Sequence, residues 1–111
     1  MPDLDPEDEK LIILARSTRA RIQAAEGAAV RDTDGRTYAA ATIDLPSLKL
    51  TAVQAAVAAA VSSGAEGLEA AAVVTADPLV AGASVQAVRD LTEHAPILRA
   101  DPSGAVQEIV E

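Results

Sequence analysis

The sequence predicts an α/β fold in which helices cover both faces of a mixed five-stranded sheet. The longest apolar run, residues 50–64, is rich in alanine and is typical of a buried helix. A second apolar run, residues 68–75, is typical of a central strand that is buried on both faces. Downstream of it, helical and strand patterns alternate, which indicates parallel pairing and right-handed crossovers with helices on both sides of the sheet.

The composition indicates one domain over residues 1–111 with a core of small aliphatic side chains. Hydrophobic residues make up 50% of the chain, but Tyr38 is its only aromatic residue. At this length roughly 65% of the unfolded surface can be buried. Burial of apolar surface stabilises a fold by about 25 cal/mol per Å², and each small side chain buries little surface. We therefore expect a marginally stable monomer that gains stability by association with other chains.

The charge and the cysteine count exclude several classes of function. The net charge of −8 comes without a basic cluster or stacking rings, which argues against nucleic-acid binding. The absence of cysteine excludes disulfides, cysteine nucleophiles and thiolate metal sites. No apolar run reaches the ~20 residues that a membrane-spanning helix needs, and the acidic N-terminus lacks a signal-peptide pattern. We therefore expect a cytoplasmic protein with no membrane contact.

The first half of the chain predicts a helix followed by a β-hairpin. Asp5 can cap a helix whose first residue is Pro6, and the acidic residues that follow favour its N-terminus. We expect this helix to end at Glu26-Gly27. The strands expected after it are residues 28–32 and 37–43, with Asp34-Gly35 as the turn between them and Pro46-Ser47 as the break before the next helix.

The alanine-rich helix is expected to begin at Leu50 and to stop at Gly64, because glycine readily adopts the left-handed backbone conformation found just past a helix end. Val53, Val57 and Val61 recur every four residues and are expected on one face of the helix. A stripe of small residues beside them would allow another helix to approach closely; it consists of Ala52, Ala56 and Ala60.

The second half supplies the remaining elements. After strand 68–75, Ser84 is a candidate cap for a third helix, which we expect to end at Ala95-Pro96. Further strands are expected over residues 97–100 and 106–110, the last because of its β-branched residues. The predicted order is therefore α-β-β-α-β-α-β-β.

Several short motifs occur along the chain in a characteristic order and spacing. They are EGAAV at 26–30, DGRTY at 34–38, AVSSG at 60–64, LTE at 91–93, and Pro96-Ile97 with the turn at 101–104. Together they resemble the cytidine deaminase family, in which V-G-A-A, D-G-x-I-Y, A-V-S-x-G and L-x-E segments follow one another. The resemblance covers most of the chain. It implies a three-layer α/β/α, cytidine deaminase-like fold and assembly into homo-oligomers, either dimers or tetramers.

The resemblance also implies a zinc site that this sequence does not supply. The family holds zinc with three protein ligands and uses a glutamate to transfer protons. Its first signature falls on Thr51, Ala52 and Val53, and its second on residues 83–87, around Ser84. None of the ligand positions carries Cys or His, and the aliphatic Val53 cannot move a proton. We therefore expect no zinc, no other cofactor and no catalytic residue.

A remnant of the family's ligand pocket is nevertheless expected. The N-x-E segment that holds the nucleoside in the family corresponds to residues 42–44, where Thr42 and Asp44 keep hydrogen-bonding groups. Asp44 has turn chemistry ahead of Pro46 as its alternative role. The only histidine, His94, is expected to be a cation near the end of the third helix. The predicted remnant pocket consists of Thr42, Asp44, Thr51, Val53 and Ser84.

These observations lead to three functional hypotheses. The leading one is a catalytically inactive, cytidine deaminase-like protein that acts as an oligomeric structural or protein-interaction module. A second is a nucleoside-binding or regulatory protein that kept a ligand pocket. The third is a hydrolase related to cytidine deaminase whose chemistry has moved to other residues.

Overall fold

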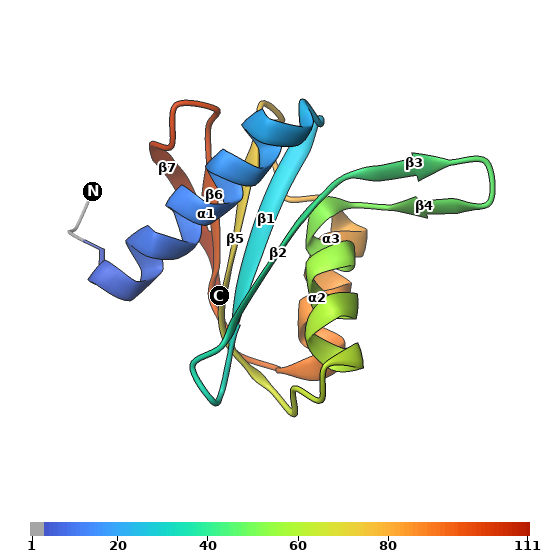
Figure 1. Ribbon diagram of the computed structural model, residues 1–111. Helices are drawn as coiled ribbons and strands as arrows, with labels where there is room; N and C mark the ends of the chain where they lie inside the picture. Colours follow the sequence, from blue (N-terminus) through green and yellow to red (C-terminus); the bar gives the residue numbers. More distant parts are fainter. Residues whose placement is uncertain (1–3) are drawn as a thin grey trace.

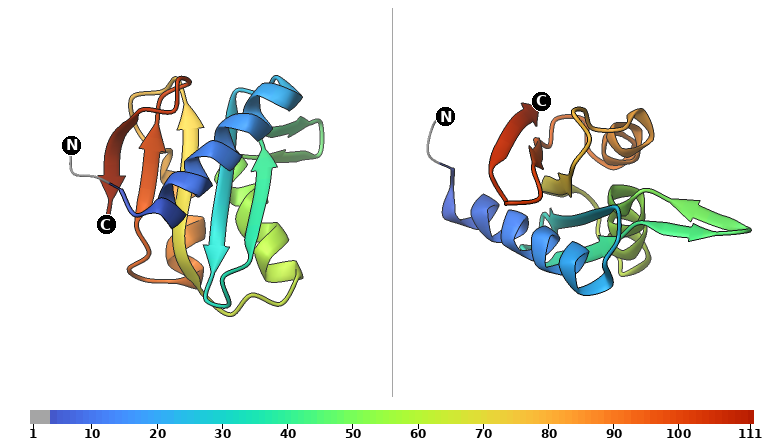
Figure 2. Two further views of the ribbon diagram at one scale, coloured as in Figure 1. Left: turned by 60° about the vertical axis from the view of Figure 1, so that its left-hand side comes forward. Right: turned by 90° about the horizontal axis from the view of Figure 1, so that it is seen from above.

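The computed structural model describes residues 4–111, which are arranged in three layers (Figure 1, Figure 2). A five-stranded sheet forms the middle layer. Helix α1 (Pro6–Ile22) covers one face, and helices α2 (Ala52–Ser62) and α3 (Gly82–Leu91) cover the other. Each face has its own cluster of buried apolar residues. The predicted α/β/α architecture with helices on both faces is therefore confirmed.

The central sheet is mixed, as predicted. Its strand order is β2-β1-β5-β6-β7, in which β5 and β6 are parallel and the other neighbouring pairs are antiparallel. The parallel pair requires a crossover connection, which α3 provides. All residues of β5 are buried except Glu69, as its apolar sequence predicts. The strands of this sheet are β1 (Glu26–Asp32), β2 (Thr37–Ala41), β5 (Leu68–Thr75), β6 (Ile97–Ala100) and β7 (Val106–Val110).

A second, two-stranded sheet was not predicted. Strands β3 (Ile43–Leu45) and β4 (Leu48–Leu50) pair as an antiparallel hairpin that projects from the body of the molecule (Figure 1). The predicted strand over residues 37–43 begins correctly at Thr37, but its end at Ile43 and the predicted helix start at Leu50 were both wrong. The reason is that Pro46-Ser47 turns the chain back on itself, so that Leu50 pairs with Ile43 before the helix begins.

Helix α1 begins as predicted and ends earlier than predicted. The Asp5 carboxylate accepts the backbone N–H of Glu7 at 2.8 Å, with Pro6 in the first helical position. The predicted end at Glu26-Gly27 was wrong, because Gln23 adopts a left-handed conformation with φ 56° and closes the helix after Ile22. Gly27 instead lies in β1.

The glycine at position 27 lets α1 pack directly on the backbone of β1. A Cβ atom placed there would lie 2.1 Å from the carbonyl oxygen of Ala15 and 2.8 Å from the backbone nitrogen of Arg19. Both atoms belong to the α1 backbone and cannot swing away. Only glycine permits this approach of helix to strand.

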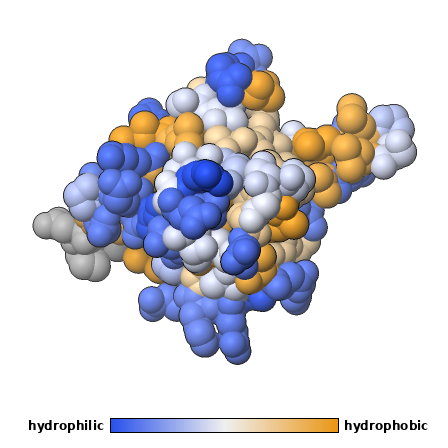
Figure 3. Space-filling model, turned by 60° about the horizontal axis from the view of Figure 1, so that its bottom comes forward, coloured by the Kyte–Doolittle hydropathy of each residue, from blue (hydrophilic) through white to orange (hydrophobic). Residues whose placement is uncertain are grey.

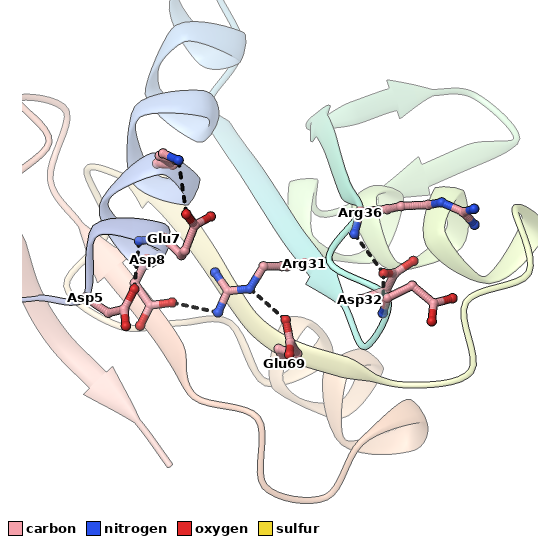
Figure 4. A network of polar contacts seen from close by, with 9 residues as sticks. Asp5, Glu7, Asp8, Arg31, Asp32, Arg36 and Glu69 are labelled. Carbon is pink, nitrogen blue, oxygen red and sulfur yellow. Dashed lines mark hydrogen bonds and ion pairs between the residues drawn. The ribbon is translucent and has the colours of Figure 1, made fainter.

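One polar network fixes α1 to the sheet, and a second stabilises the turn between β1 and β2 (Figure 4). Arg31 of β1 pairs with Asp8 of α1 at 3.0 Å and with Glu69 of β5 at 2.9 Å. The buried Asp32 carboxylate accepts the backbone N–H groups of Asp34 and Arg36, both at 2.9 Å, and the Tyr38 hydroxyl at 2.8 Å. Burial raises the pKa of the Asp32 carboxyl, but these hydrogen bonds outweigh it and hold the pKa below its ordinary value.

The elements of the second half fall close to their predicted places. The strands predicted over 68–75, 97–100 and 106–110 are confirmed with those bounds. Helix α3 differs at both ends, since it begins at Gly82 and ends at Leu91 rather than at Ala95-Pro96. Its N-cap is Ala81, so the prediction that Ser84 caps the helix was wrong; Ser84 lies within the first turn.

Helix α2 is buried on most of its surface. The small-residue stripe of Ala52, Ala56 and Ala60 is fully buried within this chain, so it packs internally and does not face a partner. Val53 and Val57 are buried, whereas Val61 is 50% exposed. At 3.6 residues per turn, a four-residue repeat drifts by about 40° per step, which carries Val61 out of the core face. Among residues 4–111, no helix has the length and apolarity needed to cross a membrane.

The contact at Gly27 leads to a test of the packing of α1 on β1. Gly27→Ala should destabilise the fold by about 2–3 kcal/mol, because neither backbone segment can yield to the new methyl group. Urea denaturation measures the change in the free energy of unfolding. Gly82→Ala is the matched control, since a Cβ there meets nothing within 4 Å, and it should not destabilise the protein. Equal stability of Gly27→Ala and the unmodified chain would contradict the described contact.

Candidate functional site

An open depression of about 380 Å³ lies where the projecting hairpin meets the starts of α2 and α3. Its walls come from four parts of the chain: the start of β1, the hairpin, the first turn of α2, and the loop that leads to α3. The residues around it are Ala25, Glu26, Thr42, Ile43, Asp44, Lys49, Leu50, Thr51, Gln54, Asp77 and Ala81.

Thr51 at the edge of this depression caps α2. Its Oγ1 accepts the backbone N–H of Gln54 at 3.1 Å, and the Gln54 side-chain oxygen accepts the backbone N–H of Thr51 at 2.9 Å. This reciprocal arrangement is a capping box, which satisfies two backbone donors at the helix start. The T-x-x-Q pattern before an apolar run is a sequence signal for this cap, and it indicates a helix start at Ala52 rather than at Leu50.

Ser84 lies behind Thr51 and is 1% exposed. Its hydroxyl donates a hydrogen bond to Thr51 Oγ1 at 2.8 Å. The two residues are 33 positions apart in the sequence, and their bond links the first turn of α2 to the first turn of α3. Thr51 Oγ1 therefore accepts two hydrogen bonds, one from each helix.

The predicted remnant pocket divides into two groups. Thr42, Asp44 and Thr51 line the depression. Val53 is fully buried in the core cluster between α2 and the sheet, and Ser84 is covered by Thr51, so neither lines the depression. The structure thus brings three of the five residues together around one cavity.

Thr42 and Asp44, two of the polar residues around the depression, have partners within the chain. Thr42 Oγ1 accepts the backbone N–H of Glu26 at 3.0 Å and donates to its carbonyl oxygen at 3.3 Å. Asp44 is paired across the hairpin with Lys49, with 3.7 Å between carboxylate and ammonium, and both side chains are largely exposed. Three carboxylates (Glu26, Asp44 and Asp77) face one ammonium group here, so the depression is acidic.

The donors in this region do not fit the zinc ion that the resemblance implies. Zinc takes thiolate, imidazole or carboxylate ligands. The positions of the two signatures carry Thr51, Val53 and Ser84, whose side chains are two hydroxyls bonded to each other and one aliphatic group. Within residues 4–111, no three Cys, His, Asp or Glu side chains lie close enough to hold a metal ion. His94 is exposed and lies beyond the end of α3.

Comparison with known proteins places these observations in a family context. The model of the family described as cytidine deaminase-like matches residues 4–104. A cytidine deaminase from Burkholderia pseudomallei superposes with a TM-score of 0.80, at 22% identity over 92% of this chain and 90% of that chain. A cytidine deaminase from Mycobacterium leprae gives a TM-score of 0.71, at 22% identity over 93% of each chain. No curated protein sequence gives a significant match.

The hydrogen bond between the two helix starts can be tested by a double-mutant cycle. Thr51→Ala should destabilise the chain by about 2–3 kcal/mol, because it removes the cap and leaves the buried Ser84 hydroxyl without its acceptor. Ser84→Ala should cost about 1 kcal/mol, since Thr51 still caps the helix. Thr51→Ser is the control that keeps both bonds. The double variant should lose about 1 kcal/mol less than the sum of the single variants; simple additivity in chemical denaturation would refute the coupling.

Proposed function

This chain belongs to the cytidine deaminase-like family, and we propose that it is a member without deaminase activity that acts as a homo-oligomeric structural or protein-interaction module. The observation that carries the proposal is the hydrogen bond from Ser84 to Thr51. In the family, zinc ligands are expected at the starts of these two helices. Here the corresponding side chains bond to each other and serve the fold.

The position expected for the proton-transferring glutamate supports the same proposal. Val53 occupies it and is 0% exposed in the core cluster beneath α2. An aliphatic side chain can neither hold nor move a proton, and a carboxylate in this apolar surrounding would be strongly disfavoured without a partner. The third hypothesis, relocated chemistry, has no comparable support, because no three Cys, His, Asp or Glu side chains of the described residues lie close enough to hold a metal ion.

The composition of the core supports the oligomeric part of the proposal. Much of the buried core is alanine or valine, and the largest fully buried side chains are Leu11, Ile97 and Leu98. Such side chains bury little area within one chain, so burial against a second copy adds stability that the monomer lacks. The cysteine-free, acidic sequence favours the cytoplasm as the compartment in which this module works.

The open depression favours a second candidate function, nucleoside binding without catalysis. It keeps about 380 Å³ of space, and Thr42, Asp44 and Thr51 bring hydroxyl and carboxylate groups to its wall. A panel of nucleosides tested by thermal shift separates the two candidates. A nucleoside present at 100 times its Kd would stabilise the chain by ~2.7 kcal/mol. The structural role predicts no shift with any member of the panel.

The loss of deaminase activity is tested by uridine formation from cytidine. We expect no uridine above the rate of a protein-free blank, even with zinc in the buffer, because the chain offers neither the ligands nor the proton-transferring group. A zinc-dependent cytidine deaminase under the same conditions is the positive control. Turnover together with stoichiometric zinc in the purified protein would overturn the proposal.

A further inference from the structure

Strand β2 is an edge strand with a backbone partner on one side only. β1 pairs with it along its length, and within residues 4–111 no other segment bonds to its outer edge. Inward bonds to β1 flank the strand, at the carbonyl oxygen of Arg36 and at the backbone N–H of Thr42. Such bonds recur at every second residue of an antiparallel pair. The residues that direct their backbone N–H and C=O groups outward are therefore Thr37, Ala39 and Ala41.

A groove of about 320 Å³ lies beside this edge, between α1 and the start of β2. Figure 2 shows α1 crossing the sheet obliquely, which leaves part of the strand beside it uncovered. Thr37 and Ala39 lie on the α1 face of the strand, opposite residues of β1 that face the same helix, and both are exposed. The residues that line the groove are Glu7, Lys10, Ile13, Leu14, Ser17 and Thr37.

The helical wall of the groove has an apolar centre. Ile13 is 65% exposed, and Leu14 beside it is only partly buried. This surface is separate from the projecting β3–β4 hairpin, whose apolar residues are seen in Figure 3, because α1 packs chiefly on β1, β5 and β2. An apolar side chain placed over the groove would remove the exposed surface of both residues from water.

A stripe along α1 brings cations to both ends of the groove. Lys10, Leu14, Ser17 and Arg21 recur at intervals of four, three and four residues, which places them on one side of the helix. The first three line the groove, and Arg21 continues the stripe into the last turn. The two cations start from backbone positions about 16 Å apart along the helix axis. This separation is close to the length of β2, whose five residues span about 17 Å.

Both cations are open to an acidic partner. Within residues 4–111, Arg21 forms no ion pair. Lys10 pairs only with Glu7, and this pair contributes little because both side chains are more than half exposed. After Glu9, α1 carries no carboxylate. A second copy of this chain fits the edge poorly, because two β2 edges paired across a two-fold axis would bring the cations of both copies together.

We infer that the free edge of β2 binds an extended acidic segment of a partner protein by strand addition. The segment pairs with the outward backbone groups of β2 and extends the five-stranded sheet. On the side that faces α1, one apolar residue covers Ile13 and Leu14. Carboxylates two residues before and two residues after it approach Lys10 and Arg21. The inference rests on the protein-interaction part of the proposed function and gives that part a surface and a class of partner.

NMR titration of the ¹⁵N-labelled full chain tests the inference with two capped pentapeptides. The acidic probe has the sequence E-T-V-T-E, which places both carboxylates and the valine on one face of a strand. The control K-T-V-T-K differs only in charge. The acidic peptide should bind at least about tenfold more tightly, because it makes two ion pairs where the control meets two like charges. The largest amide shifts should occur at Thr37, Ala39 and Ala41.

Two sets of variants separate the backbone contact from the charges. Ala39→Pro removes an outward N–H, which an edge strand tolerates, and should weaken binding of the acidic peptide at least about tenfold. Ala39→Ser keeps the N–H and should bind as the unmodified chain does. Lys10→Glu combined with Arg21→Glu should reverse the preference to the basic peptide, whereas Arg16→Glu, on another side of α1, should keep it. Circular dichroism checks that each variant is folded.

Each remaining outcome overturns the inference. It fails if neither peptide binds, if both bind equally well, or if the amide shifts avoid β2. It fails equally if the amide signals of β2 shift with protein concentration alone, because a second copy then occupies the edge. None of these results bears on the proposed absence of deaminase activity or on homo-oligomeric assembly, whereas uridine formation would overturn the proposed function without changing the peptide titration.

Discussion

The hydrogen bond from Ser84 to Thr51 is the contact that joins the parts of the chain around the depression. It joins the starts of α2 and α3, and Thr51 also caps α2 and follows directly after the hairpin strand β4. Thr51 thus connects the edge of the depression, the end of the hairpin and the starts of both helices. A buried hydroxyl without a partner would cost about 1–3 kcal/mol, so this pairing is strongly favoured over alternative packings.

A neutral hydrogen bond holds two helices together far less strongly than a metal ion does. A structural zinc ion contributes about 10–16 kcal/mol of apparent binding energy, whereas one net hydrogen bond contributes about 1 kcal/mol. Other contacts also hold the scaffold together: the close packing of α1 over Gly27, the Arg31 ion pairs that link three elements, and strand β5, which is buried except at Glu69. The first two of these contacts lie on the α1 face of the sheet, away from the starts of α2 and α3.

How far the sequence predicts this structure depends on the range of the interactions. Strands β5, β6 and β7 follow from local apolar and β-branched patterns, and the start of α1 follows from Asp5 and Pro6. The β3–β4 hairpin does not follow from the sequence, because its strands have three residues each and the turn at Pro46-Ser47 also fits the end of a strand. The contact between Thr51 and Ser84 spans 33 positions and has no local signal. The role of Gly27 likewise appears only when Ala15 is brought against it.

The central claim is that the family fold persists here with a hydrogen-bonded pair at the positions of the zinc ligands. Thermal unfolding of the purified chain in a strong zinc chelator and in excess zinc tests it most directly, with a zinc-dependent cytidine deaminase as the control. The account predicts the same unfolding midpoint in both conditions, because Thr51, Val53 and Ser84 hold no metal. A midpoint that rises with zinc and falls with the chelator, as linkage requires for a metal bound only by the folded chain, would contradict it.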